Sequence, residues 1–332
     1  MKEITITTQK MAGAHAQGWQ IWGWEIPVYL FLGGLTAGII VVASWMILKN
    51  RGKEYPVATN KIMVLAPVLI SLGMGALFLD LSHKLYVWRF YTTFQVTSVM
   101  SWGSWILVLV YPVTILLVLA TFREGFPAVY GWVEERIKQI RDGRFLPWFK
   151  AVVDFAETRK NIFAKAGIPI GIGLGIYTGI LLSAFAARPI WNSAILGPLF
   201  LVSGMSTGVA LIALLSRDDE RHYFARMDMG LIVVELFILF LFFIGQLTSG
   251  KAQQEAISLL LGGSIMTPVF WIFVFTLGLF LPLVFEWLEM KGRDIPAVLP
   301  PVMVLFGGLM LRFVLVKVCC LWRDMSIDQL LR

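Results

Sequence analysis

Eight long apolar runs constrain this chain more than any other feature of its sequence. Crossing about 30 Å of hydrocarbon takes roughly 20 helical residues. Runs of that length occupy 26–48, 62–82, 99–121, 166–187, 193–215, 228–248, 266–286 and 297–320. Lipid cannot hydrogen-bond to backbone groups, so each run must satisfy its own amides and carbonyls as a helix. The sequence therefore predicts an all-α integral membrane protein with eight transmembrane helices.

The distribution of basic residues predicts how the helices are oriented. The sequence has a net charge of +7 with only 15% charged residues, and a basic surplus can indicate nucleic-acid binding or cytoplasmic loops. Eighteen Lys and Arg residues lie between spans 1 and 2, 3 and 4, 5 and 6, and 7 and 8, against eight on the opposite side. By the positive-inside rule, both termini are extracytoplasmic. We expect a multi-pass protein of the inner membrane that contacts lipid and binds no nucleic acid.

Two further patterns concern packing. The loop 122–165 interleaves Trp, Val and Ile with charges at helical spacing, which predicts two interfacial helices on the cytoplasmic surface, broken near Gly143. Small residues recur every fourth position in three of the spans, and this spacing favours close approach of helices. They are Gly34 and Gly38, Gly167 to Gly179, and Gly204 and Gly208.

Ionisable residues gather at the predicted outer end of span 2. Asp80 and His83 are three residues apart, so a continuous helix would place them on one face. A carboxylate beside an imidazole can relay protons near neutral pH. The alternative is an interfacial salt-bridge cluster that fixes the helix end. Glu25, at the outer end of span 1, could face the same cleft.

Two charged residues lie deep within the later spans. Glu235 is about seven residues into span 6, and Arg312 lies within span 8. Charges at this depth are costly and must be paired or neutralised. A proton path and a structural ion pair both explain them.

The sequence holds no pattern for a redox metal. The histidines are His15, His83 and His222, none deep inside a span, so a bis-histidine haem is not expected. The adjacent Cys319 and Cys320 match no iron–sulfur or other metal motif. Electron chemistry would need a partner protein or an organic cofactor.

Three stretches and one short motif resemble a known family. They are WEIPVYLFLGGLTAG from Trp24, LDLSHKLYVWRFYTTFQVTSVMSWGSW from Leu79, IYTGILLSAFAARPIWNSAILGPLFLVSGMSTG from Ile176, and GGLMLR ending at Arg312. Together they resemble the NrfD-like, polysulfide-reductase membrane-subunit family, from span 1 to span 8.

The resemblance implies an eight-helix core of two four-helix bundles, which we place at 26–187 and 188–320. The ends 1–25 and 321–332 are the segments that the basic residues predict to be extracytoplasmic. It implies a pocket for menaquinone or ubiquinone near the outer face of the first bundle. Tyr177 falls where the family tyrosine bonds a quinone carbonyl, and Asp80 or His83 matches the proton-handling end of span 2. The other residues expected at this pocket are Glu25, Arg89 and Trp102.

The same resemblance implies partners. A ferredoxin-like iron–sulfur subunit is expected on the extracytoplasmic face, with a molybdenum or tungsten catalytic subunit or a multihaem cytochrome beyond it. The leading function is therefore exchange of electrons and protons between the quinone pool and the iron–sulfur partner. The alternatives are a catalytically silent membrane anchor and an ion-translocating module. The path of such a module would use Glu235, Glu286, Arg312 and Lys317.

Overall fold

The protein is described by a computed structural model that covers residues 22–81, 83–139, 144–185, 188–262, 264–293 and 295–330, without the side chains of 218 and 320–330. All regular secondary structure in these ranges is helical. Eight helical stretches are long and apolar enough to span a membrane. They are α2 (Glu25–Leu48), η1 to α3 (Val57–Asp80), α5 (Val99–Gly125), α8 (Lys160–Ser183), α9 (Leu196–Leu215), α10 (Asp218–Leu247), α12 to α13 (Met266–Met290) and α14 (Leu299–Leu330). The predicted eight-span, all-helical fold is confirmed.

Shorter or irregular elements complete the structure. Span 2 begins as the π-helical turn η1 and the 3₁₀ turn η2 before α3, and the π-helix η5 makes up 12 of the 25 residues of span 7. Their bounds are η1 Val57–Lys61, η2 Ile62–Val64, α3 Leu65–Asp80, η3 Lys84–Tyr86, α4 Arg89–Thr92, α11 Lys251–Leu261, α12 Met266–Pro268, η5 Val269–Phe280 and α13 Leu281–Met290.

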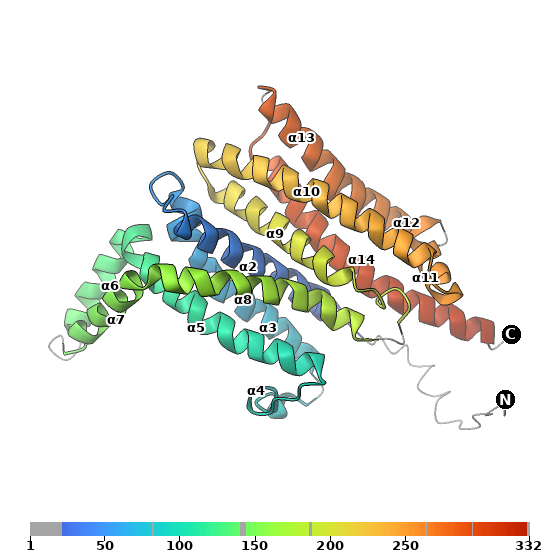
Figure 1. The fold of residues 1–332 in the computed structure, drawn as a ribbon, viewed down its shortest axis with the longest axis horizontal. Helices are drawn as coiled ribbons and strands as arrows, with labels where there is room; N and C mark the ends of the chain where they lie inside the picture. The colour runs from blue at the N-terminus through green and yellow to red at the C-terminus, as the bar shows by residue number, and fades with distance from the viewer. Residues whose placement is uncertain are drawn as a thin grey trace.

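Helix α2 is central to the fold (Figure 1). It packs against α3, α8, α9 and α14. In the most apolar 18-residue stretch of α2, 83% is buried inside the protein, whereas only 28% is buried in the corresponding stretches of span 6 and span 7. Those outer helices expose large apolar side chains such as Phe237 and Phe240, which suits contact with lipid. The division into two four-helix bundles stays a prediction, because α2 joins helices of both expected halves.

Glycines allow the close contacts of α2 and α8. A Cβ at Gly38 would meet the backbone of Gly204, and a Cβ at Gly208 would meet that of Gly38. Along α8, Gly167 and Gly171 face α2, while Gly175 and Gly179 face α9. The predicted packing role of these small residues is confirmed.

Two helix ends differ from the predicted spans. Helix α3 ends at Asp80, and Leu81 is extended with ψ 127°. His83 then precedes the separate turn η3. The prediction that Asp80 and His83 share one helix face is therefore wrong, because the helix stops between them. Helix α8 ends at Ser183, four residues before the predicted end of span 4.

The loop after α5 forms the expected pair of helices. They are α6 (Pro127–Gln139) and α7 (Leu146–Thr158), which lie together beside the end of α5 in Figure 1. Arg123 of α5 binds Asp154 and Glu157 of α7 at 2.9 and 2.8 Å. The predicted break near Gly143 lies outside the described residues. The position of α6 and α7 on the membrane surface stays a prediction.

Candidate functional site

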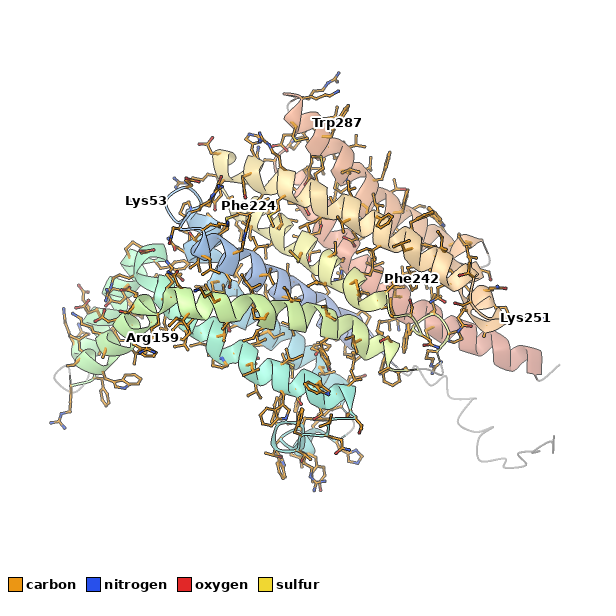
Figure 2. All side chains as sticks on the ribbon, viewed as in Figure 1. Lys53, Arg159, Phe224, Phe242, Lys251 and Trp287 are labelled. Carbon is orange, nitrogen blue, oxygen red and sulfur yellow. The ribbon has the colours of Figure 1, made fainter. Side chains whose placement is uncertain are left out.

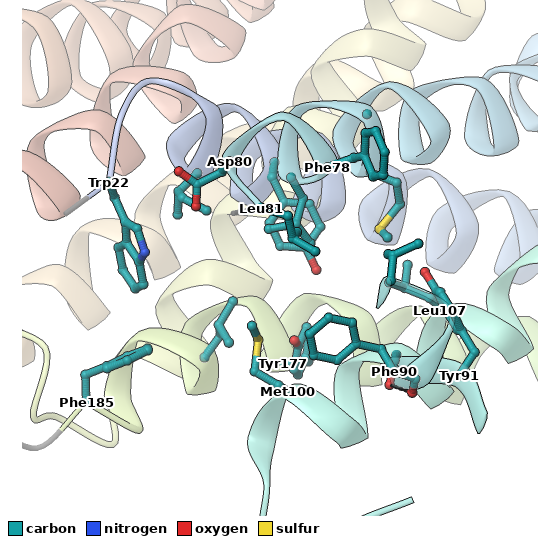
Figure 3. Close-up of a pocket in the computed structure, with 18 residues that line it drawn as sticks. Trp22, Phe78, Asp80, Leu81, Phe90, Tyr91, Met100, Leu107, Tyr177 and Phe185 are labelled. Carbon is teal, nitrogen blue, oxygen red and sulfur yellow. Dashed lines mark hydrogen bonds between the residues drawn. The ribbon is translucent and has the colours of Figure 1, made fainter. Parts of the chain in front are cut away.

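A cavity of about 550 Å³ lies among α2, α3, α4, α5 and α8. It is at the end of the molecule where α2 begins and where α3 and α8 end, which is the predicted outer end. Figure 3 shows Asp80 and Leu81 on one side of it, with Tyr177, Met100 and Phe185 on the other. Most of the lining is apolar. Its polar side chains are Asp80, Tyr29, Tyr91, Ser104 and Tyr177, together with the indole of Trp22.

Two tyrosines form the buried polar wall of the cavity. The phenols of Tyr29 on α2 and Tyr177 on α8 interact with each other, and both side chains are buried. Each hydroxyl carries one hydrogen, so the pair can donate to a ligand in the cavity. The Tyr177 ring lies directly against Gly103 of α5, where any Cβ would overlap it. The close passage of α5 thus fixes the phenol.

Asp80 is the last residue of α3 and lines the cavity with its carboxyl group exposed. Glu25 lies outside the lining, but its charge acts on Asp80. Tyr91 of α4 is a third phenol at the cavity. Burial raises the pKa of the Tyr91 hydroxyl, so this group stays protonated at neutral pH and can donate a hydrogen bond. Ser104 already donates to the carbonyls of Phe90 and Ser101.

Besides Glu25, three residues expected at the pocket lie outside its lining. His83 is exposed on the segment after α3, with its ring 6.5 Å from that of Tyr86. Arg89 stacks over the ring of Tyr86 at 4.7 Å. Trp102 donates to the carbonyl of Val96 and lines a separate apolar groove on α5. The structure thus brings Asp80 and Tyr177 to one cavity and leaves His83, Arg89 and Trp102 outside its lining.

Contacts of Trp22 and Trp191 connect the lining of the cavity to α14. Trp22, in the lining, stacks on Trp191 at 4.8 Å. The Trp191 indole donates to the carbonyl of Leu315, and Lys317 donates to the carbonyl of Trp22. Lys317 therefore supports the cavity wall.

A second polar centre lies deep among α9, α10 and α14. Arg312 is fully buried and donates to Ser203 Oγ at 2.7 Å and to the Gly308 carbonyl at 2.8 Å. The buried carboxyl group of Glu235 interacts with both Ser203 and Arg312, so this centre contains the two predicted residues.

A pair of buried carboxyl groups continues this centre toward the predicted cytoplasmic end. Asp228 of α10 and Glu286 of α13 are both buried and interact with each other. Asp228 also accepts from Ser206 at 2.6 Å. Beyond them, Glu289 binds Arg221 and His222 at 3.1 and 3.2 Å. Oδ2 of Asp228 and Oε2 of Glu286 are buried without a hydrogen-bond partner among the described residues.

Sequence reasoning missed Tyr29 and Asp228. Tyr29 stands four residues after Glu25 in an otherwise apolar run, and a phenol one helical turn from an acidic residue could have indicated it. Asp228 stands seven residues before Glu235, a spacing that places both on one helix face. Among the residues that the structure describes, no group of three or more His, Cys, Asp or Glu side chains could hold a metal ion.

Fold and cavity together define a multi-pass helical membrane protein with a ligand-sized, mainly apolar pocket at one end of its helices. The model of the family "Polysulphide reductase, NrfD" matches residues 13–321. The chain belongs to this family.

Named relatives show the same relationship. The C component of polysulfide reductase from Wolinella succinogenes is 30% identical over 275 residues, covering 80% of this protein and 82% of the relative. Protein NrfD of Escherichia coli is 30% identical over 307 residues, covering 88% and 93%. The C component of selenate reductase from Mesobacillus selenatarsenatis is 26% identical over 208 residues, covering 58% and 47%.

Proposed function

We propose that the cavity beside Asp80 and Tyr177 binds a membrane quinone, and that the protein exchanges electrons and protons between this quinone and an iron–sulfur partner. The observation that carries the proposal is the meeting of a buried tyrosine pair and an exposed carboxyl group in one apolar cavity. Its volume of about 550 Å³ lies within the usual range of small-molecule pockets. The relatives named as parts of polysulfide and selenate reductases support a place in a reductase complex.

The lining fits a quinone chemically. A quinone has a flat apolar ring, carbonyl oxygens that accept hydrogen bonds, and an isoprenoid tail. Met100, Leu107 and Leu181 supply apolar contacts for the ring and tail. An O–H of the Tyr29 and Tyr177 pair would donate to one carbonyl. The proposal covers menaquinone and ubiquinone equally.

The remaining polar residues are assigned to proton transfer. When bound, a quinone exchanges two electrons and two protons with its quinol form. Asp80, at the end of α3, takes up and releases protons between the cavity and the outer surface. His83, three residues further and exposed, passes them to solvent. Glu25 adjusts Asp80 through its charge, while Arg89 and Trp102, outside the lining, are assigned no contact with the head group.

The electron partner is a ferredoxin-like iron–sulfur subunit on the extracytoplasmic face. A molybdenum or tungsten subunit or a multihaem cytochrome would complete the complex in the inner membrane. Titration of the purified complex should find one quinone per copy of this protein, displaced by a quinone-site inhibitor that stops turnover. A complex that binds no stoichiometric quinone would instead support the silent anchor.

A second function, ion translocation, is supported by a separate observation. Buried polar groups continue from Glu289 through Glu286 and Asp228, and a second buried group joins Glu235 to Arg312. Buried carboxyl groups at membrane depth are suited to proton transfer. In sealed vesicles, turnover should drive proton uptake that Asp228→Asn and Glu235→Gln reduce. The control Glu255→Gln, on an exposed side chain of α11, should leave uptake unchanged. Unchanged uptake in all three variants would exclude this path.

A further inference from the structure

A groove of about 570 Å³ runs between α10 and α13, on the part of the molecule opposite the cavity. Met229, Gly230 and Val233 of α10 line one side, and Leu283, Val284 and Trp287 of α13 line the other. Figure 2 labels Trp287 near the end of α13, where this helix lies beside α10. A Cβ built at Gly230 meets no atom within 4 Å, so the missing side chain keeps the groove open.

The mouth of the groove is positively charged. Arg226 lies in the lining with an exposed side chain. The Lys291 ammonium lies 3.7 Å from the centre of the Trp287 ring, and Lys291 is exposed. The nearby acidic groups are engaged: Glu289 is paired with Arg221 and His222, and Glu286 is buried.

The depth of the groove matches the upper part of a lipid tail. Val233 follows Arg226 by seven residues, which is about 10 Å along the helix. Trp287 is 46% exposed, and aromatic residues of this kind gather at the level of lipid head groups. The cationic end of the groove thus lies at head-group depth, and its apolar end lies within the hydrocarbon.

We propose that this groove binds one anionic phospholipid, with an acyl tail between α10 and α13 and the phosphate held by Arg226 and Lys291. Charge complementarity selects an anionic phospholipid over a zwitterionic one. The apolar lining selects a lipid over free phosphate. The site is separate from the quinone cavity and does not depend on the proposed function.

The test is native mass spectrometry of the purified protein, titrated with phosphatidylglycerol or phosphatidylcholine of identical acyl tails. The wild type should bind one phosphatidylglycerol more tightly than phosphatidylcholine. Arg226→Gln and Lys291→Gln should each weaken phosphatidylglycerol binding about fivefold and leave phosphatidylcholine binding unchanged. Arg217→Gln, an exposed cation at the same end, is the matched control and should have no effect.

The groove itself is tested by Gly230→Leu, which should remove the tight site for both lipids. Gly173→Leu is its control, because Gly173 is also a helical glycine with open space around its Cβ. Equal affinity for the two lipids, or a tight site that persists in Gly230→Leu, overturns the proposal. So does competition by sn-glycerol 3-phosphate, which would indicate a plain phosphate site. A dimer that Gly230→Leu dissociates would assign the groove to a second copy of the protein. The two Gln variants change exposed side chains and remain informative if Gly230→Leu fails to fold.

Discussion

Replacing Tyr177 with Phe tests the cavity most directly. The change keeps the ring against Gly103 and removes only the hydroxyl that interacts with Tyr29. A net hydrogen bond contributes about 0.5–1.5 kcal/mol, so loss of a bond to a quinone carbonyl should weaken quinone binding by about 2- to 13-fold. We expect an assembled complex with a higher apparent KM for quinone.

The same substitution leaves Tyr29 buried without its partner, which costs about 1–3 kcal/mol of stability. The double variant Tyr29→Phe with Tyr177→Phe removes both hydroxyls, so it should regain most of that stability while quinone binding stays weak. Thermal unfolding and quinone titration of the purified complex measure the two effects separately. Tyr130→Phe, which removes a hydroxyl on α6 that accepts from Arg123 at 3.2 Å and lies outside the cavity lining, is the control for loss of a phenol. Wild-type quinone kinetics in an assembled Tyr177→Phe complex would refute the assignment.

Four further outcomes are expected. Gly103→Ala should displace the Tyr177 ring, and its effect on quinone KM should not add to that of Tyr177→Phe. Asp80→Asn should lower turnover more than quinone affinity, because it keeps the shape and removes the ionisable group; equal losses in both would contradict a proton-transfer role. Gly38→Leu should destabilise the fold by about 3 kcal/mol or more, because its side chain would overlap the Gly204 backbone, seen as a lower melting temperature. Reporter fusions should place both termini outside the cytoplasm, and activity of a cytoplasm-only reporter at both ends would reverse the topology.

The eight spans and the glycine contacts were predictable because both depend on local sequence. Hydrocarbon thickness sets the length of an apolar run, and glycines four residues apart mark one helix face wherever that face packs. The end of α3 was not predictable in this way. Leu81 is as apolar as the leucines of the run, so hydropathy alone predicts that the helix continues past Asp80. In the structure the backbone becomes extended at Leu81.

The candidate site was predictable only in part, for a related reason. Asp80 stands out in the sequence because ionisable groups near lipid are costly, whereas Tyr177 was predicted only through the family resemblance. The earlier end of α8 at Ser183 places Tyr177 six residues from the helix end instead of ten, about 9 Å along the axis. This brings it closer in depth to Asp80 than the predicted span allowed. The pairing of Tyr29 with Tyr177 depends on how α2 crosses α8, and no pattern within either helix encodes that crossing.

Helix α2 also explains why the cavity and the buried polar centre around Arg312 stay separate. Tyr29 faces Tyr177 at the cavity, while Gly34 admits the Arg312 guanidinium, whose Nη2 would lie 3.0 Å from a Cβ at that position. Five helical residues separate Tyr29 from Gly34, which is about 7.5 Å of rise and roughly 140° of rotation. The two centres therefore lie on different faces and at different depths of one rigid helix. Three direct routes connect the two centres: this helix, the packing of α8 against α9, and α14, which supports Trp22 with Lys317 and carries Arg312 five residues earlier.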